Sequence, residues 1–277
     1  MKNTATDPAA SSHAPSAPSP QQPLLLERNG TIATLRFNRP EALNAIDVPM
    51  ANAFLTAVQS IAADPGVRAV VLCGSGRGFM AGGDLATLRA DPVQGAIDIL
   101  TPLNAALQLL AQMNAPVIAQ VHGAAAGAGL SLVLMADYVI AAEGTRFNLA
   151  YINLGTSCDV GASWALPRIV GVRQALEIAL LGEAFTADDA LRLGLVNRVV
   201  PSAELDSTTA ALAQRLANGP TLAYGAMKRL MRASIDHTLP EQLAAEKDAF
   251  VHCAGTEDFR AGVEAFHQRQ SPQFVGR

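Results

Sequence analysis

The chain has 277 residues, of which half are hydrophobic and 16% are charged, and its formal net charge is -4 at pH 7. A chain of this length can bury a sizeable core. The slightly negative charge and the scattered Lys and Arg residues give no basic surface for nucleic acid or an anionic membrane. We therefore expect neither kind of partner.

The three cysteines indicate a reducing compartment. Cys73, Cys158 and Cys253 are odd in number, far apart in sequence and without metal-ligand spacing, which favours free thiols, a cytoplasmic location and no metal site. No apolar run is long enough for a signal-peptide core or a membrane span, so a soluble protein is expected. Residues 1–23, rich in Pro, Ser, Thr and Ala, are predicted to be a disordered tail.

The regular elements begin at Leu24, where two short strands are predicted around an Asn29-Gly30 turn. An alternation of helix and strand follows. In chain order we expect a helix over 49–63, a buried strand over 67–74, a helix over 101–113, a strand over 116–121, a helix over 127–135 and a strand over 138–142. Such alternation predicts an α/β fold with parallel pairing and right-handed crossovers.

After Trp164 the pattern becomes almost wholly helical. Thr186 followed by Asp189 resembles a helix N-terminal cap, and Gly194 resembles a helix stop. No Pro- or Gly-rich linker interrupts the chain after residue 23 and no internal repeat is evident, which favours one compact unit.

Two glycine-rich segments follow buried strands: GRGFMAGGDL at 76–85 and VHGAAAGAGLSL at 121–132. Small residues let a ligand approach the main chain, and the N–H groups at a helix start lack intrahelical partners. If a helix begins near Gly127, the amides of its first turn can bind an oxyanion. Tight packing of helix and strand is the structural alternative. Neither segment matches a nucleotide-binding motif.

These segments, together with FNRPEALNAI at 37–46, PVIAQVHGAAAGAGLSLVLMADYVIAA at 116–142 and LPRIVG at 166–171, resemble successive signatures of the crotonase (enoyl-CoA hydratase/isomerase) superfamily. The resemblance covers about residues 24–275. It implies a spiral of ββα repeats over 24–200, a helical region over 201–277 that covers the active site and mediates assembly, and a homotrimer or dimer of trimers.

By the same resemblance, an acyl-CoA thioester lies between the glycine-rich loops, with coenzyme A as part of the substrate and no permanently bound cofactor. The oxyanion hole maps onto the backbone N–H groups of Gly83 and Ala128. Further substrate contacts are expected from Ala42, Ala81, Gly82, Asp84, Leu85, Gly127, Ser131 and Tyr151.

Hydratases of this family use two glutamates, and their positions fall on Ser131 and Tyr151. Water activation by a carboxylate pair is therefore absent. One carboxylate remains, Asp159, which resembles the sole catalytic aspartate of the 2-(1,2-epoxy-1,2-dihydrophenyl)acetyl-CoA isomerase group. That group also shares a Trp five residues later, here Trp164, and a terminal SPQFxG, here SPQFVG at 271–276.

Several of these residues also have a purely structural interpretation. Asp159 could cap the following helix, Asp84 a turn or helix, and Asp137 and His122 read as structural. Ser131 could bond to the backbone and Tyr151 could line the acyl pocket. Lys228 and Arg229 could meet CoA phosphates, although a solvated helix face is the preferred reading.

The sequence thus predicts an acyl-CoA isomerase that shifts a double bond or opens a ring epoxide through a thioester enolate. Asp159 is its acid and base, and Gly83 and Ala128 hold the enolate oxygen. The alternatives are an enoyl-CoA hydratase with a non-standard acid such as Asp84 or Asp98, and a catalytically weak acyl-CoA-binding protein.

Overall fold

The computed structural model describes residues 22–277. The tail predicted over residues 1–23 lies outside this part, apart from Gln22 and Pro23. The carbonyls of these two residues accept hydrogen bonds from the side chain and the backbone N–H of Asn38.

A six-stranded sheet forms the centre of the molecule, in the order β1-β2-β3-β4-β6-β9. Only β1 and β2 pair antiparallel, through the predicted hairpin, and the other neighbours are parallel. Its strands are β1 (Leu24–Asn29), β2 (Ile32–Phe37), β3 (Ala69–Gly74), β4 (Val117–Val121), β6 (Tyr138–Ala142) and β9 (Arg198–Val200). Every residue of β3 is buried, as its β-branched run predicts.

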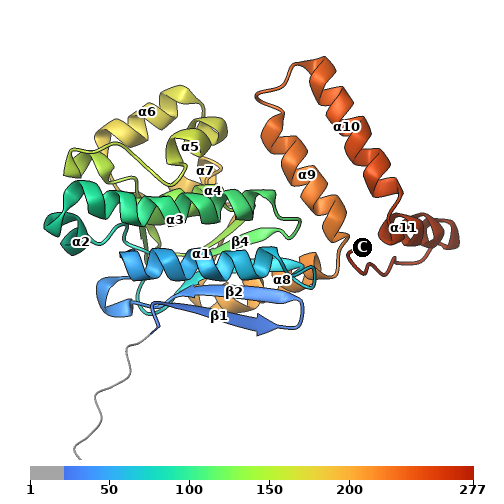
Figure 1. The fold of residues 1–277 in the computed structure, drawn as a ribbon, viewed down its shortest axis with the longest axis horizontal. Coiled ribbons are helices and arrows are strands. Elements are labelled where there is room, and N and C mark those ends of the chain that lie inside the picture. Colours follow the sequence, from blue (N-terminus) through green and yellow to red (C-terminus); the bar gives the residue numbers. More distant parts are fainter. Residues whose placement is uncertain (1–21) are drawn as a thin grey trace, which may run out of the picture.

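Helices cover both faces of this sheet (Figure 1). The long helices α1 (Val48–Ala62) and α3 (Pro92–Gln112) lie on one face, over the main hydrophobic core. Helix α8 (Leu205–Ala217) packs on the opposite face, where Ala213 and Ala217 contact Val71 and Ile118. The α/β prediction is confirmed.

A second, small sheet stacks successive turns of the chain. It contains β5 (Ala124–Ala126), β7 (Arg146–Asn148) and β8 (Phe185–Thr186), with β5 and β7 parallel and β7 and β8 antiparallel. Isolated parallel bridges join Met80 to Ala125 and Ile46 to Gly83. Both glycine-rich loops therefore belong to one ladder.

The shorter helices surround this ladder. They are α2 (Leu85–Ala90), α4 (Ala128–Met135), α5 (Ala162–Val170), α6 (Val172–Leu181) and α7 (Ala187–Arg192), with the 3-10 turns η1 (Pro40–Ala42), η2 (Tyr151–Leu154) and η3 (Ser202–Glu204). Thr186 and Asp189 form the predicted capping box of α7.

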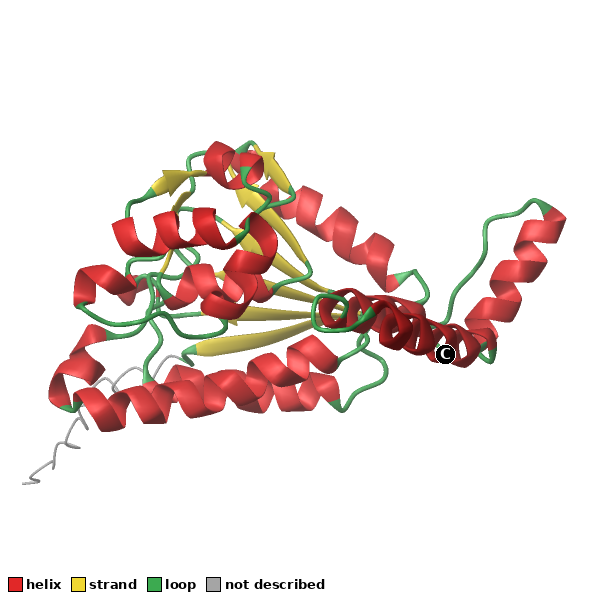
Figure 2. Cartoon of the chain, turned by 90° about the horizontal axis from the view of Figure 1, so that it is seen from above, coloured by secondary structure: helices red, strands yellow, loops and turns green. Residues whose placement is uncertain are grey.

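The C-terminal helices α9 (Thr221–Ala233), α10 (Leu239–Ala254) and α11 (Glu257–Gln268) form an arm that extends away from the sheet (Figure 2). A buried ion pair anchors it: Lys228 Nζ lies 2.7 Å from the Asp137 carboxylate, and Arg232 bonds the other oxygen at 2.8 Å. Lys228 also donates to the carbonyls of Leu110 and Ala115. Asp137 is structural, as predicted.

Three expectations need correction. Lys228 does not lie on a solvated face, because its side chain is only 8% exposed and paired with Asp137. The helix expected from Thr101 starts at Pro92, where the Asp91 carboxylate caps it by accepting from the N–H of Gln94. The region after Trp164 also contains strands, and β9 completes the central sheet.

None of the helices within residues 22–277 combines the length and the apolar character that crossing a membrane would require.

Replacing Lys228 with Ala should lower the free energy of unfolding by about 3 kcal/mol, because Asp137 would lose its nearest cation while staying largely buried. Urea denaturation measures this loss. The neighbouring Arg229 is exposed, so Arg229→Ala serves as the control, with a change below about 1 kcal/mol. Equal losses in the two variants would contradict the anchoring role of Lys228.

Candidate active site

The first glycine-rich loop is held on both sides of Gly83. Ile46 donates its N–H to the carbonyl of Gly82 at 2.8 Å, and Asp84 donates its N–H to the carbonyl of Ile46 at 2.8 Å. The N–H of Gly83 itself donates to no other group within residues 22–277. The ladder thus fixes this amide while leaving it free for a ligand.

The side chain of Asn44 stabilises this loop through hydrogen bonds. It is fully buried, and its side-chain oxygen accepts from the N–H of Arg39 at 2.9 Å. Its amide group donates to the carbonyls of Ser75 at 2.8 Å and Gly78 at 2.9 Å. A φ of 58° places Asn44 in the left-handed region, which Asn tolerates better than most residues.

The second loop approaches the first at backbone distance. Gly127 has φ 51° and ψ -121°, a conformation that requires glycine. A Cβ atom on Gly127 would lie 3.6 Å from the Cα of Gly82, so the two loops touch. Nearby, a Cβ on Gly129 would lie 2.3 Å from the carbonyl oxygen of Met80, which excludes any larger residue. The small residues therefore serve tight packing as well as access.

Helix α4 begins at Ala128, immediately after Gly127. As the first residue of the helix, Ala128 has no intrahelical acceptor for its N–H. Within residues 22–277 this N–H donates to no other group. Two unengaged amides, those of Gly83 and Ala128, thus lie in touching loops, and the positive end of the α4 dipole adds to the second. The arrangement suits a developing oxyanion.

Asp159 lies at the end of a hydrogen-bonded chain of side chains. The hydroxyl of Tyr151 donates to Oδ1 of Asp159, and Ser131 Oγ lies 2.9 Å from the Tyr151 oxygen. Ser131 is fully buried on α4 and also contacts the carbonyl of Gly127 at 3.2 Å. The two residues that the family resemblance places at the hydratase glutamate positions are therefore connected by hydrogen bonds to the predicted base.

Burial raises the pKa of the Asp159 carboxyl, and the hydrogen bond from Tyr151 offsets part of that rise. Burial also raises the pKa of Tyr151, as does the adjacent Asp159 charge, so the phenol remains protonated. A carboxyl group with a raised pKa can both accept and return a proton near neutral pH.

Asp159 does not cap the following helix. Helix α5 starts at Ala162 with Gly161 as its N-cap, and no side chain caps it. Next to Asp159, the buried residue Val160 has φ 53°, a left-handed conformation that is strained for a β-branched side chain. Strain of this kind, of order 1–3 kcal/mol, gathers where a side chain is held for function.

The other predicted substrate contacts lie partly on the first glycine-rich loop and partly on the 3-10 turns η1 and η2. Ala42 ends η1, and Ala81 and Leu85 are exposed on either side of Gly83. Tyr151 is the first residue of η2, and its hydroxyl donates to Asp159.

Asp84 is occupied in a structural role. Its Oδ1 accepts from the N–H groups of Ala86 and Thr87 as the N-cap of α2, and its Oδ2 pairs with Arg39 at 2.9 Å. Burial favours a higher pKa for Asp84, but these hydrogen bonds outweigh it and the net pKa is lowered. Such a carboxylate is a poor proton donor.

Asp98, the other candidate acid, is exposed on α3 and accepts a hydrogen bond from the side chain of Gln94.

His122 bonds the carbonyl of Gly76 at 2.9 Å, as its structural reading predicts. Lys228 is committed to Asp137 and cannot reach a phosphate without breaking that pair. Arg229 is exposed and bonds the carbonyl of Gln112 and the side chain of Asn114.

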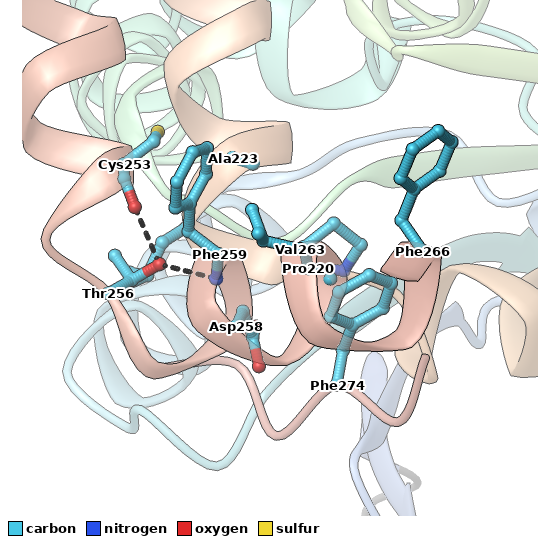
Figure 3. A pocket seen from close by; sticks show the side chains of 11 residues that line it. Pro220, Ala223, Cys253, Thr256, Asp258, Phe259, Val263, Phe266 and Phe274 are labelled. Atoms are coloured by element: carbon cyan, nitrogen blue, oxygen red, sulfur yellow. Dashed lines mark hydrogen bonds between the residues drawn. The ribbon is translucent and has the colours of Figure 1, made fainter. Parts of the chain in front are cut away.

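An apolar hollow of about 360 Å³ lies in the C-terminal arm (Figure 3). Phe259, Val263 and Phe274 line it. Its one carboxylate, Asp258, accepts from the N–H groups of Val275 and Gly276 and is thereby occupied. No free base faces this hollow within the described chain, so we assign the chemistry to the glycine loops.

The sequence profile of the enoyl-CoA hydratase/isomerase family matches residues 27–277. The chain belongs to this family. The 1,2-epoxyphenylacetyl-CoA isomerase of Escherichia coli is 37% identical over 250 residues, covering 89% of this chain and 95% of that protein. The 2,3-dehydroadipyl-CoA hydratase of the same organism is 35% identical over 255 residues, covering 92% and 99%.

A solved structure of this family, an enoyl-CoA hydratase of Mycobacterium smegmatis, superposes with a TM-score of 0.86 at 35% identity and covers 92% of this chain and 99% of its own. The crotonase-type fold is thus confirmed. The similar proteins include both hydratases and isomerases. Membership in the family therefore shows that the chain is an enzyme of this family, but it does not distinguish between the two reactions.

Asn44 and Arg39 are site-supporting residues that the sequence analysis missed. Both occur in FNRPEALNAI at 37–46, one of the segments that resemble the family. Arg39 donates to the carbonyl of Ala45 at 2.6 Å and pairs with Asp84. The available signal was a polar Asn between apolar neighbours just before a helix.

Asn44→Ala should lower the free energy of unfolding by about 2 kcal/mol, since buried carbonyls and the N–H of Arg39 would lose their partners. Turnover should fall as well, because the Gly83 amide would lose its support. The control is Asn52→Ala on the exposed face of α1, with an expected change within about 0.5 kcal/mol. Denaturant titration measures both, and an Asn44→Ala protein as stable as the control would contradict this role.

Proposed function

We propose that this enzyme isomerises an unsaturated or ring-epoxidised acyl-CoA, with Asp159 as its single acid and base. The observation that carries the proposal is one carboxylate with a raised pKa, bonded to Tyr151 and, through it, to Ser131. By the family resemblance, those two residues stand where hydratases carry their glutamates.

The reaction needs a proton to leave and return. Asp159 removes the α-proton of a 3-enoyl thioester, and the electron pair moves to form a dienolate whose oxygen is held by the N–H groups of Gly83 and Ala128. Each such donor is worth about 3 kcal/mol in the transition state. The same carboxyl then delivers its proton to the γ-carbon, which gives the 2-enoyl thioester with no net gain or loss of protons.

A ring-epoxidised arylacetyl thioester offers a similar acidic α-position, and the E. coli relative named for such a substrate supports it as the second candidate class. In both classes coenzyme A enters with the substrate, and the chemistry assigned to these residues uses no resident cofactor.

The hydrogen bonds of Ser131 and Tyr151 disfavour a hydratase reaction. A hydratase needs a base for water and an acid for the α-carbon. Here Tyr151 is protonated and donates to Asp159, and Ser131 is buried against Tyr151. Asp84 and Asp98 are engaged elsewhere. The hydratase among the similar proteins keeps this reaction as the alternative.

The third possibility is a binding protein with little turnover. It requires that no carboxylate be placed for chemistry, and Asp159 counts against it. The proposal also includes assembly as a homotrimer or dimer of trimers, which the exposed apolar residues of the arm support, among them Met231, Phe250 and Phe266. A cytoplasmic location fits the three free thiols.

Asp159→Asn should lower turnover of a 3-enoyl-CoA, or of the epoxyphenylacetyl thioester, by at least about 10³-fold, because the amide can neither take nor return the proton. Conversion to the 2-enoyl thioester is followed by its absorbance. The matched control is Asp98→Asn, whose exposed carboxylate lies on α3, and its rate should equal that of the wild type.

Loss of fold cannot explain this result if the melting temperature is retained. Burial raises the pKa of Asp159, so the ionised carboxylate lowers the stability of the folded protein. This loss of stability develops as the pH rises from the ordinary aspartate pKa through the raised one. Asp159→Asn removes this cost and should melt no lower than the wild type at pH 8. Equal turnover by wild type and Asp159→Asn, or rapid hydration of crotonyl-CoA, would overturn the proposal.

A further inference from the structure

We propose that Tyr151 is a positioning residue that holds Asp159 by Oδ1, so that Oδ2 alone carries the proton, and that Ser131 ties this pair to the helix bearing the oxyanion donor. The inference rests on the proposed function, since it assigns a task to the residues around its base. Tyr151 and Ser131 do not themselves exchange protons with the substrate.

The single hydrogen on each hydroxyl group determines which residue is the donor in each of these hydrogen bonds. The phenol of Tyr151 has one hydrogen, and it donates to Oδ1 of Asp159. The contact of 2.9 Å between Ser131 and Tyr151 can therefore be a hydrogen bond only if Ser131 is the donor. Ser131 also has one hydrogen, so it then donates to Tyr151 in place of the Gly127 carbonyl, which lies at the longer distance of 3.2 Å. When Asp159 takes up a proton, Oδ1 is already an acceptor, so the proton goes to Oδ2.

Helix α4 joins the two halves of the site. Ala128, its first residue, offers the oxyanion N–H, and Ser131 lies three residues later in the same helix. Ser131 is fully buried and its hydroxyl also contacts the carbonyl of Gly127, one turn back. The chain from Ser131 through Tyr151 to Asp159 therefore sets how far the base stands from the oxyanion donor.

Besides burial, the Tyr151 hydrogen bond sets the basicity of Asp159. The pKa of Asp159 responds to burial first and then to the Tyr151 hydrogen bond, with no contribution from a charged side chain of the described residues. Helix α4 carries no titratable residue, and η2 carries only Tyr151. Cys158 is the titratable neighbour in sequence, and Arg168 on α5 is paired with Asp236.

Asp159 must be ionised to accept the α-proton, so kcat/KM falls as the pH drops through its pKa. The Tyr151 hydrogen bond lowers that pKa. Removing the hydroxyl should raise the pKa and move the acid limb of the pH profile to higher pH, by about one unit for the loss of one hydrogen bond to a charged group.

The test compares Tyr151→Phe and Ser131→Ala with wild type, using a 3-enoyl-CoA between pH 5 and 9. The acid limb of kcat/KM should shift upward by about one unit in Tyr151→Phe and in the same direction, by less, in Ser131→Ala. KM should change little, because neither variant alters Gly83 or Ala128. Tyr138→Phe, on β6 of the central sheet, is the control and should leave the limb unmoved.

Infrared titration of the protonated carboxyl band that disappears in Asp159→Asn supplies a readout without substrate. Its midpoint should rise in Tyr151→Phe and, if that variant folds poorly, in Ser131→Ala, which keeps the tyrosine ring. An unmoved limb and midpoint in both variants, with Asp159→Asn inactive, would refute the positioning role alone. Full activity of Asp159→Asn would instead refute the proposed function.

Discussion

The structure of the site depends on the close approach of two backbones at the start of α4. Gly82 and Gly127 touch, and Gly129 leaves no room for a side chain beside Met80. The approach is possible because successive turns of the chain stack in one ladder, from Ile46 through Gly83 to the strands of the small sheet. Each turn hydrogen-bonds its neighbours, and the N–H groups of Gly83 and Ala128 are left over. The proposed oxyanion site is therefore a product of the stacking itself.

A half-buried carboxylate linked to such a site through Tyr151 and Ser131 lowers stability and helps proton transfer for the same reason. Removal from water disfavours the charge on Asp159 and raises its pKa. The raised pKa lets one group take and return a proton, while the same poorly solvated surroundings strengthen the amides that hold the oxyanion. Tyr151 limits the cost by bonding one oxygen. One base and two amides suffice for moving a double bond, whereas adding water calls for a second acid.

Much of this arrangement is predictable from local patterns. Strand β6 and the start of α4 follow from apolar runs and glycine positions, and the motifs around Gly83, Ala128 and Asp159 indicate the family. The features that the sequence does not predict depend on contacts between residues that are not neighbours in any local pattern. The burial of Lys228 requires Asp137, on the turn before β6. The contact between Tyr151 and Asp159 requires a 3-10 turn that closes on Gly155 in the left-handed region, and no periodicity encodes it.

The central claim is that the thioester oxygen sits on the Gly83 and Ala128 amides while Asp159 faces the carbon that loses its proton. A crystal structure with a bound, non-reacting acyl-CoA thioester tests it most directly. The account predicts the thioester oxygen within about 3 Å of both nitrogens, with Oδ2 of Asp159 the nearest carboxylate oxygen to the α-carbon. A thioester oxygen away from these amides, or Asp84 closer to the α-carbon than Asp159, would contradict it.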